Sequence, residues 1–335
     1  MGKKKVTVVF TGGTIAMGVD PKTGGAVPLL KGEDLMNSMP DLKGLADIEI
    51  LNFCNKPGPH IQISDVLELG RTIRGLFDSG QADGVVVTHG TDTIEETAFE
   101  LDLLLRCPNP VVITGAMRNS SLISADGPAN IFNAILTAAD PAARDKGVLV
   151  AFNNEIHLAR EVTKASATQL NAFRSPLFGP VGFIYGQSVQ FVRPHGLRDY
   201  IPAENISAQV ELIKFTLGMG SFLLDAIRDS PVDGVVIEGA GVGHVSLAVA
   251  EGIKRLIAAG KPVVLTSRCY ESLVLEDSYA FVGSEKDLRE AGAIPAPGLN
   301  GPKARIKLIL ALSWRPEMNR IRDLFQAPVA YRRAP

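Results

Sequence analysis

Two apolar runs that stop abruptly in glycine and threonine constrain the fold of this chain more than any other feature. Residues 6–10 run into residues 11–14 (TGGT), and residues 85–87 run into residues 88–92 (THGTD). A buried strand followed by a tight turn has this pattern. Because ligands of open α/β sheets bind at the carboxyl ends of the strands, we expect both turns at a ligand-binding edge.

The alternation of strand and helix patterns continues along the chain. Such alternation predicts an α/β protein with a parallel sheet and right-handed crossovers. A less regular stretch at 176–202, with glycine, proline and aromatic residues, precedes a second α/β pattern. We therefore predict an N-terminal domain at 1–190, a linker at 191–210 and a C-terminal domain at 211–335. The expected strands are 6–10, 48–53, 85–88, 111–114, 148–152, 234–237 and 262–266, and the expected helices include 66–77 and 128–139.

A helix is expected directly after the second turn. Thr93 and Glu96 have the spacing of a capping box, and an apolar stripe follows at Ile94, Ala98, Leu101 and Leu105. Thr91 and Asp92 then lie at a helix N-terminus, among N–H groups without intrahelical partners. If Thr93 and Glu96 supply the cap, Asp92 is available for a substrate ammonium and Thr91 for a hydroxyl or water.

Composition and charge exclude several classes of partner. The chain has 46% hydrophobic residues, a net charge of −2 and a pI near 6.2, which predicts a globular protein without a nucleic-acid surface. No apolar stretch is long enough to span a membrane, and no signal-peptide cleavage site follows residues 6–10, so a cytoplasmic protein without a membrane role is expected. Cys54, Cys107 and Cys269 lack zinc-site spacing and are expected to be buried structural thiols.

Thr14 and three histidines are candidates whose roles the residues alone leave open. Thr14 follows two glycines, so it could be a nucleophile, or it could cap the next segment while the glycines cradle a phosphate. His89 is expected to be a packed, hydrogen-bonded residue that orients its turn rather than a general base. His60 and His244 are isolated, and a structural or surface position is the expectation for both.

The two turns together resemble the paired signature of the bacterial-type L-asparaginase family. The signature comprises residues 11–16 (TGGTIA) and 89–93 (HGTDT). Segments at 162–180, 238–244 and 299–305 are similar to later parts of the same family, so the resemblance spans nearly the full length. It implies a larger N-terminal domain with a parallel-type sheet and flanking helices, and a smaller flavodoxin-like C-terminal domain. It also implies a homo-oligomer, usually a tetramer made of two intimate dimers.

The resemblance further implies hydrolysis of a side-chain amide, with neither a metal nor an organic cofactor. By this likeness Thr14 is the nucleophile that forms an acyl-enzyme and releases ammonia. Thr91 and its backbone N–H position water or the developing oxyanion, and Asp92 binds the α-ammonium of the substrate. Lys164, otherwise read as a surface lysine, tunes Thr91. Burial would lower its pKa and let it act as a base.

The segment after the first turn departs from the family pattern. A tyrosine normally follows the first threonine by about a dozen residues, but Ala26 or Val27 stands there and no tyrosine precedes Tyr185. Any hydroxyl that assists Thr14 must then come from elsewhere in the chain or from a neighbouring subunit.

The groups expected to bind the amino-acid end of the substrate have also changed. A family serine that binds the α-carboxylate aligns with Gly58, which has no hydroxyl, and is followed by Pro59, which has no N–H, and His60. His244 takes the approximate place of an asparagine that reaches the substrate amine across the dimer. These four residues, with Asp92, are the predicted substrate-binding set.

The sequence therefore predicts an amidohydrolase whose leading substrate is L-asparagine. A related activity on glutamine, a D-isomer or another small amide is the alternative. A second alternative is the ammonia-producing subunit of a tRNA-dependent amidotransferase, which residues 19–27 resemble. A third is a catalytically weak amide-binding protein.

Overall fold

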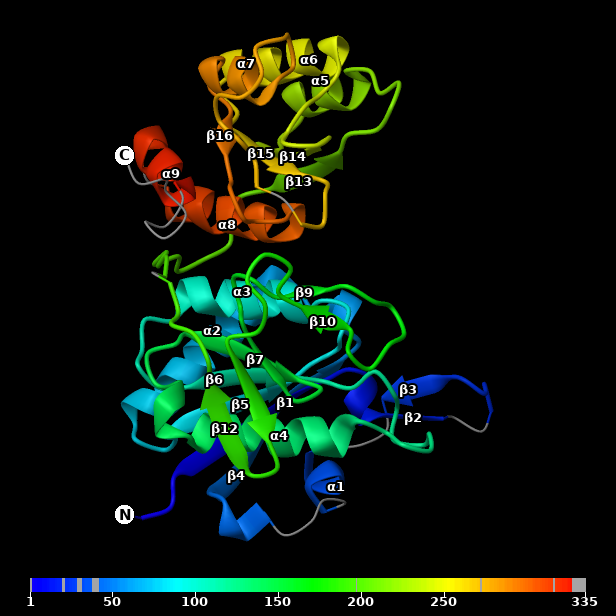
Figure 1. The fold of residues 1–335 in the computed structure, drawn as a ribbon, viewed down its shortest axis with the longest axis vertical. Coiled ribbons are helices and arrows are strands. Elements are labelled where there is room, and N and C mark those ends of the chain that lie inside the picture. Colours follow the sequence, from blue (N-terminus) through cyan, green and yellow to red (C-terminus); the bar gives the residue numbers. More distant parts are fainter. Residues whose placement is uncertain are drawn as a thin grey trace. The chain divides into compact units, whose positions relative to one another are not determined.

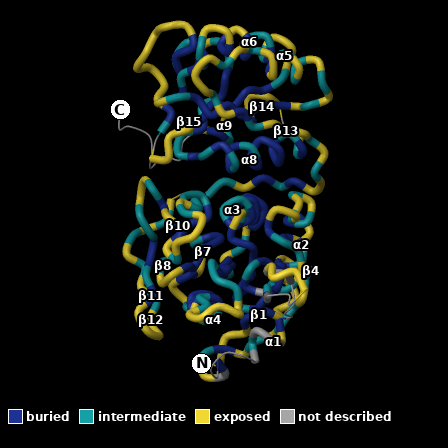
Figure 2. The backbone as a smooth tube through the Cα atoms, turned by 90° about the vertical axis from the view of Figure 1, so that its right-hand side faces the viewer, coloured by how far each residue is buried: buried dark blue, intermediate teal, exposed yellow. Residues whose placement is uncertain are grey.

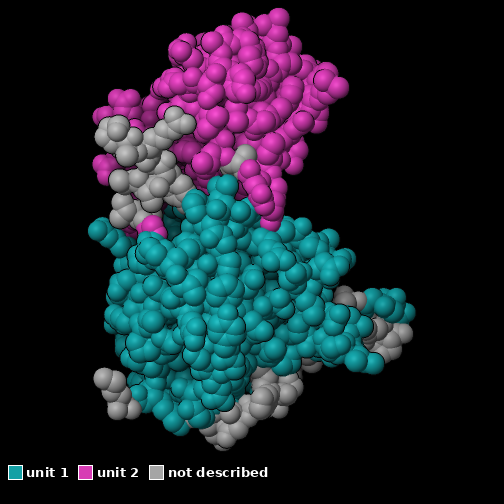
Figure 3. All heavy atoms as spheres, in the orientation of Figure 1, with its two compact units in different colours: residues 1–195 teal, residues 196–335 magenta. Residues whose placement is uncertain are grey.

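In the computed structural model the chain divides into two units, Met1–His195 and Gly196–Pro335, which are coloured separately in Figure 3. The structure describes residues 2–19, 22–28, 32–37, 42–196, 198–271, 273–315 and 317–326. The predicted linker, 191–210, starts on the last residue of one strand and ends on the first residue of another. The domain limits of 1–190 and 211–335 remain a proposal.

The first unit contains a large sheet, several short strands and flanking helices (Figure 1). Its strands are β1 (Lys5–Gly12), β2 (Met17–Val19), β3 (Ala26–Pro28), β4 (Asp47–Lys56), β5 (Gly84–Thr88), β6 (Val111–Thr114), β7 (Val148–Phe152), β8 (Glu155–Leu158), β9 (Thr163–Lys164), β10 (Phe173–Arg174), β11 (Gly182–Tyr185) and β12 (Ser188–Phe191). Its helices are α1 (Gly32–Asn37), α2 (Ile63–Asp78), α3 (Ile94–Leu104) and α4 (Gly127–Ala139), with the 3-10 helices η1 (Thr14–Ala16), η2 (Leu42–Gly44), η3 (Gly58–His60) and η4 (Pro141–Ala143).

The large sheet has the order β12-β11-β8-β7-β6-β5-β1-β4. Strands β4, β1, β5, β6 and β7 pair in parallel, as the sequence predicts. The pairs β7-β8, β8-β11 and β11-β12 are antiparallel, so the sheet is mixed. Strands β11 and β12 lie in the stretch predicted to be irregular. Both strands are short and partly exposed, so they contain no apolar run that would reveal them in the sequence.

Alternating side chains of the central strands enter two hydrophobic cores, one on each face of the sheet. Val85 and Val87 of β5 pack with residues of α2 and α3, whereas Val86 packs with residues of α4. Figure 1 shows α2 and α3 over one face and α4 over the other, and the buried strands appear dark blue in Figure 2. This two-sided burial is typical of parallel strands and fixes the register of the sheet.

The second unit is a smaller α/β domain, as predicted. Its sheet has the order β13-β14-β15-β16 and is parallel throughout. Helices α5, α6 and α7 contribute to the core on one face, and α8 covers the other. The elements are β13 (Val210–Lys214), α5 (Phe222–Arg228), β14 (Gly234–Gly239), α6 (Leu247–Ala258), β15 (Val263–Ser267), α7 (Glu285–Glu290), β16 (Ile294–Pro295), α8 (Gly301–Trp314) and α9 (Met318–Phe325).

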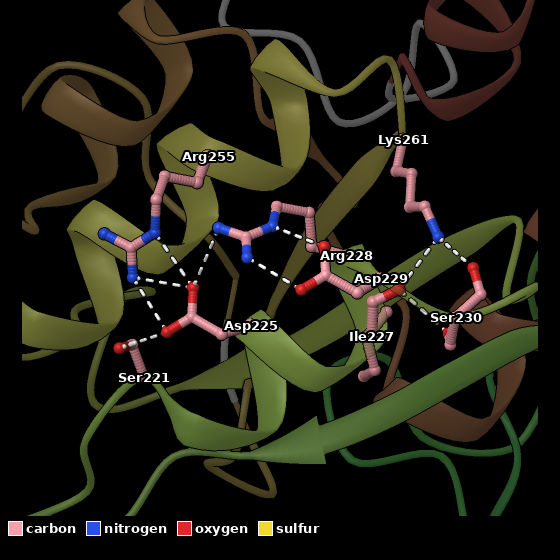
Figure 4. Close-up of polar contacts among 8 residues, drawn as sticks. All are labelled: Ser221, Asp225, Ile227, Arg228, Asp229, Ser230, Arg255 and Lys261. Carbon is pink, nitrogen blue, oxygen red and sulfur yellow. Dashed lines mark hydrogen bonds and ion pairs between the residues drawn. The ribbon is translucent and has the colours of Figure 1, made fainter.

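Polar contacts fasten α5 to its surroundings in this unit (Figure 4). The ammonium of Lys261 donates to the carbonyl oxygens of Ile227, Ser230 and Val232 at 2.7–2.8 Å, so it satisfies carbonyls at and just beyond the end of the helix. Arg255 of α6 pairs with Asp225 of α5 through two hydrogen bonds of 2.9 and 3.0 Å. These contacts link neighbouring elements within the second unit.

None of the helices in the described part of the chain has the length and apolar character needed to cross a bilayer.

Candidate active site

Three turns pack backbone against backbone at one edge of the large sheet. β1 pairs with β4 on one side and with β5 on the other, so the turns that follow these strands are neighbours. A Cβ built on Gly13 would lie 2.3 Å from the nitrogen of Gly90, and one built on Gly90 would lie 2.7 Å from the nitrogen of Gly58. Only glycine permits so close an approach, so the absence of side chains at these three positions lets the turns pack together.

Thr14 begins η1 directly after the first of these turns. Gly13 precedes it with φ +81°, a left-handed conformation that favours glycine. The Gly13 nitrogen donates to the carbonyl of Lys56 at 3.2 Å, which ties the turn to the end of β4. Thr14 is half-buried at this edge, next to the turn that carries Thr91.

Thr91, Asp92 and Lys164 form one hydrogen-bonded group, although Lys164 is more than seventy residues away in the sequence. The Nζ of Lys164 donates to Thr91 Oγ1 at 2.9 Å and to Asp92 Oδ1 at 2.7 Å. Thr91 is buried, with 6% of its surface exposed, whereas 64% of the Asp92 side chain is exposed. The group therefore joins a buried hydroxyl to a carboxylate that is open to solvent.

A hairpin of two short strands, β9 and β10, positions Lys164 in this group. β9 pairs with β10 so that Lys164 lies opposite Phe173, and Ala165 N donates to the Ala172 carbonyl at 2.7 Å. Phe173 is buried against Phe152 of β7, with ring centroids 4.8 Å apart. The ammonium therefore extends from an anchored segment, and only 15% of the side chain is exposed. The surface position that the residues alone suggested is wrong.

The predicted capping box at Thr93 and Glu96 is wrong. Thr93 is the N-cap residue of α3 by position, but its side chain makes no capping hydrogen bond. Its hydroxyl instead donates to the carbonyl of Gly58 at 3.0 Å, joining the turn after β5 to the turn after β4. The spacing of residues within one segment does not show that a distant carbonyl competes for the Thr93 hydroxyl.

Gly58 has a packing role in this structure. A Cβ built on it would lie 3.2 Å from both the Gly90 carbonyl oxygen and Thr93 Oγ1, which leaves little room for a side chain. In the same η3 turn, the N–H of His60 already donates to Pro57, and Pro59 has no N–H. The His60 ring is exposed, and together with Gly58 and Pro59 it remains a predicted substrate-binding residue.

His89 is buried in the turn that carries Thr91, with 1% of its surface exposed. Its Nδ1 lies 2.9 Å from the Gly90 carbonyl oxygen, and its Nε2 lies 3.0 Å from Thr97 Oγ1. Burial lowers the pKa of His89 below its usual value, which the hydrogen bond to Gly90 partly offsets. These contacts agree with the predicted orienting role.

His244 makes its contacts within the second unit. Its Nε2 lies 3.0 Å from Glu285 Oε2, and its ring packs edge-on against Tyr279 and Phe281, with centroid distances of 4.7 and 5.0 Å. The other carboxylate oxygen of Glu285 accepts the N–H groups of Ser278 and Tyr279. His244 is therefore part of a local network, and its role toward substrate remains a prediction.

Two contacts near the site, made by Thr11 and Cys54, are not predicted from the sequence. The Thr11 hydroxyl donates to the Thr88 carbonyl at 2.7 Å and ties the ends of β1 and β5 together. The Cys54 thiol donates to the Thr11 carbonyl at 3.2 Å, and burial raises its pKa. Both contacts join separate strands, so no local pattern signals them.

The cysteine prediction was wrong in detail. Cys54 and Cys107 are half-buried, and Cys269 is exposed. Within the described ranges, no group of three His, Cys, Asp or Glu side chains is placed to hold a metal ion. The side chains of Ala26 and Val27, where the family tyrosine is missing, lie outside the described part of the structure.

The protein is thus a two-domain α/β protein that carries a hydroxyl, an ammonium and a carboxylate at the carboxyl edge of its larger sheet. Residues 5–196 match the family model "Asparaginase, N-terminal", and residues 209–325 match "Glutaminase/Asparaginase C-terminal domain". The chain therefore belongs to the asparaginase family.

Named relatives match along nearly the whole chain. It is 33% identical over 328 residues to L-asparaginase 2 of Escherichia coli, covering 96% of this chain and 92% of that protein. The same identity and coverage relate it, over 329 residues, to a probable periplasmic L-asparaginase of Haemophilus influenzae. The crystal structure of a probable cytoplasmic L-asparaginase from Campylobacter jejuni superimposes with a TM-score of 0.87 at 32% identity, covering 96% of this chain and 99% of that one.

Proposed function

We propose that this protein hydrolyses the side-chain amide of L-asparagine to L-aspartate and ammonia. The observation that carries the proposal is the Lys164 ammonium, bonded to both Thr91 and Asp92 beside the turn of Thr14. The three relatives described above are named as L-asparaginases, which supports the same substrate.

In the first step of the proposed reaction, the Oγ of Thr14 attacks the amide carbon of the substrate. A C–O bond forms, the C–N bond breaks, and the hydroxyl proton ends on the leaving nitrogen as ammonia departs. The product is an ester between Thr14 and the substrate acyl group. The half-buried position of Thr14 at the sheet edge supports this role.

In the second step, water attacks the ester and regenerates the Thr14 hydroxyl. Thr91 is the proposed residue that positions this water or, through its N–H, the developing oxyanion. Its buried hydroxyl and its hydrogen bond to Lys164 support this assignment, because a group fixed before the reaction needs little reorganisation. Lys164 is proposed to tune the Thr91 hydroxyl.

Asp92 is proposed to bind the α-ammonium of the substrate. Its Oδ1 accepts from Lys164, and no described residue hydrogen-bonds to its Oδ2. Because the carboxylate is exposed, its Oδ2 can accept a charge-assisted hydrogen bond from an incoming ammonium. Gly58, Pro59, His60 and His244 complete the proposed substrate-binding set.

We also propose a cytoplasmic homotetramer built from two intimate dimers. The assembly rests on the family resemblance. A cytoplasmic location is supported by the name of the Campylobacter jejuni structure, while the Haemophilus influenzae relative is named periplasmic. Fractionation of the source cells, with the protein followed by antibody, tests the location.

The function is tested by ammonia release from L-Asn, D-Asn, L-Gln, D-Gln and amides that lack the α-amino or α-carboxyl group. L-Asn is expected to be the best substrate, and Thr91→Val is expected to lower its turnover by about 100-fold or more. Thr91→Ser, which keeps the hydroxyl, is the matched control. Turnover confined to another amide would redirect the substrate assignment. Calorimetric binding without ammonia release from any amide would contradict the proposed reaction.

A further inference from the structure

The peptide group between Gly90 and Thr91 links His89 to the proposed reaction. Its carbonyl lies 2.9 Å from His89 Nδ1, and its N–H belongs to Thr91, whose hydroxyl accepts from Lys164. A peptide group is planar and nearly always trans, so its carbonyl and its N–H point in opposite directions from one rigid plane. Whatever fixes the carbonyl therefore also fixes the direction of the N–H.

Packing around Gly90 limits translation of this peptide but leaves its rotation to be controlled. The Cα of Gly90 lies against the backbones of Gly13 and Gly58. These contacts resist movement of the chain, whereas tilt of the peptide plane depends on what holds the carbonyl. Within the described residues, the other hydrogen bond to this carbonyl is from Thr93 N, at a long 3.5 Å. His89 therefore provides the stronger hold.

Chemistry assigns the tautomer of His89. A carbonyl oxygen can only accept a hydrogen bond, so Nδ1 must carry the proton that is donated to Gly90. Nε2 then accepts from the hydroxyl of Thr97 at 3.0 Å. Burial, which lowers the pKa of the ring, keeps this neutral form present at neutral pH.

We propose that His89 is a positioning residue that orients the Thr91 N–H by holding the Gly90 carbonyl through Nδ1. The inference rests on the proposed function and concerns the role of Thr91 in which its N–H stabilises the developing oxyanion. Amide hydrolysis then depends on Nδ1 of His89, although this ring is not one of the reacting groups.

Two substitutions at His89 separate the roles of its nitrogens. In His89→Asn the side-chain amide lies near the position of Nδ1 and can donate to Gly90, whereas in His89→Gln it lies near the position of Nε2. We expect His89→Asn to keep kcat within about fivefold of wild type and His89→Gln to lower it by about 10- to 100-fold, with KM changed by less than about threefold. Equal kcat values for the two variants would overturn the inference.

Thr97 distinguishes positioning from general loosening of the buried ring. Thr97→Val removes the partner of Nε2 but leaves the bond from Nδ1 to Gly90, and Thr97→Ser is its matched control. Thr97→Val is expected to lower the thermal midpoint while its kcat stays within about threefold of Thr97→Ser. A loss of kcat as large as that of His89→Gln would show that only packing matters.

The wild-type protein gives a test that survives if the His89 variants fail to fold. ¹⁵N NMR of histidine-labelled protein is expected to show His89 protonated at Nδ1 and unprotonated at Nε2 at pH 7; the opposite tautomer overturns the inference. A wild-type protein that releases no ammonia would refute the proposed function and with it the catalytic part of this inference. An active wild type with equal His89 variants refutes the positioning role alone.

Discussion

Three glycines determine how closely the reacting groups can approach one another. Gly13, Gly58 and Gly90 belong to turns after three different strands, yet their backbones are in direct contact. The sequence predicts that glycines allow sharp turns, but their mutual packing depends on the strand order β4-β1-β5, which local patterns do not encode. Their small size is therefore a tertiary requirement as well as a conformational one.

Gly13→Ala is expected to destabilise the protein by about 1–3 kcal/mol and to lower activity as well. The new Cβ would lie 2.3 Å from the Gly90 nitrogen, at a φ of +81° that alanine rarely adopts. Urea denaturation measures the loss. The matched control is Gly75→Ala in α2, where nothing lies within 4 Å of the new Cβ, and a gain of about 0.5–1 kcal/mol is expected. A Gly13→Ala protein as stable as wild type would refute the packing argument.

Helix α3 carries a buried carboxyl group that no part of the proposed reaction uses. Glu100 is 1% exposed, and within the described residues its Oε1 has no hydrogen-bond partner. Burial raises the pKa of Glu100 well above its ordinary value, so the folded protein holds a proton that the unfolded chain releases near pH 4. The free energy of unfolding is therefore highest below that pH, and it falls as pH rises from there through the folded-state pKa.

Glu100→Gln should increase the free energy of unfolding relative to wild type by an amount that grows as pH is raised from 4 to 7. Each pH unit in this window changes the wild-type folding equilibrium by up to about tenfold, and the amide does not titrate. Chemical denaturation across the pH series measures the difference. Glu68→Gln, on the exposed face of α2, is the control, and its free energy of unfolding should differ little from that of wild type. A constant difference between Glu100→Gln and wild type across the series would contradict the raised pKa.

Local patterns predicted the elements that place Thr14 and Thr91, but they did not predict all the contacts of the site. The predicted strands at 6–10 and 85–88 lie within β1 and β5, and the apolar stripe of α3 is buried as expected. Strands β11 and β12 were missed because an edge hairpin needs no continuous apolar run. Thr93 was misread because a distant carbonyl attracts its hydroxyl. The family resemblance, and no local pattern, pointed to Lys164.

The second unit has large apolar side chains on its surface. Leu217 is fully exposed, and Phe222 and Leu247 are exposed by 80% and 64%. Exposed apolar surface of this kind is typical of protein–protein interfaces. We propose that neighbouring chains of the oligomer cover these side chains.

Light scattering coupled to size exclusion is expected to give a mass about four times the 35.7 kDa of one chain. Phe222→Glu, which places a charge on this surface, should reduce the assembled fraction, and Glu68→Gln should leave it unchanged. A single species of one-chain mass at micromolar concentration would contradict the tetramer.

Ammonia release from L-asparagine by wild type and by Thr14→Val, measured on folded protein at equal concentration, is the decisive test of Thr14 as the nucleophile. We expect steady turnover by wild type and a loss of about 1,000-fold or more in Thr14→Val, because the variant has no oxygen with which to form the acyl-enzyme. Thr14→Ser, which keeps a hydroxyl, should retain part of the activity. Turnover by Thr14→Val close to that of wild type would contradict the assignment of Thr14 as the nucleophile.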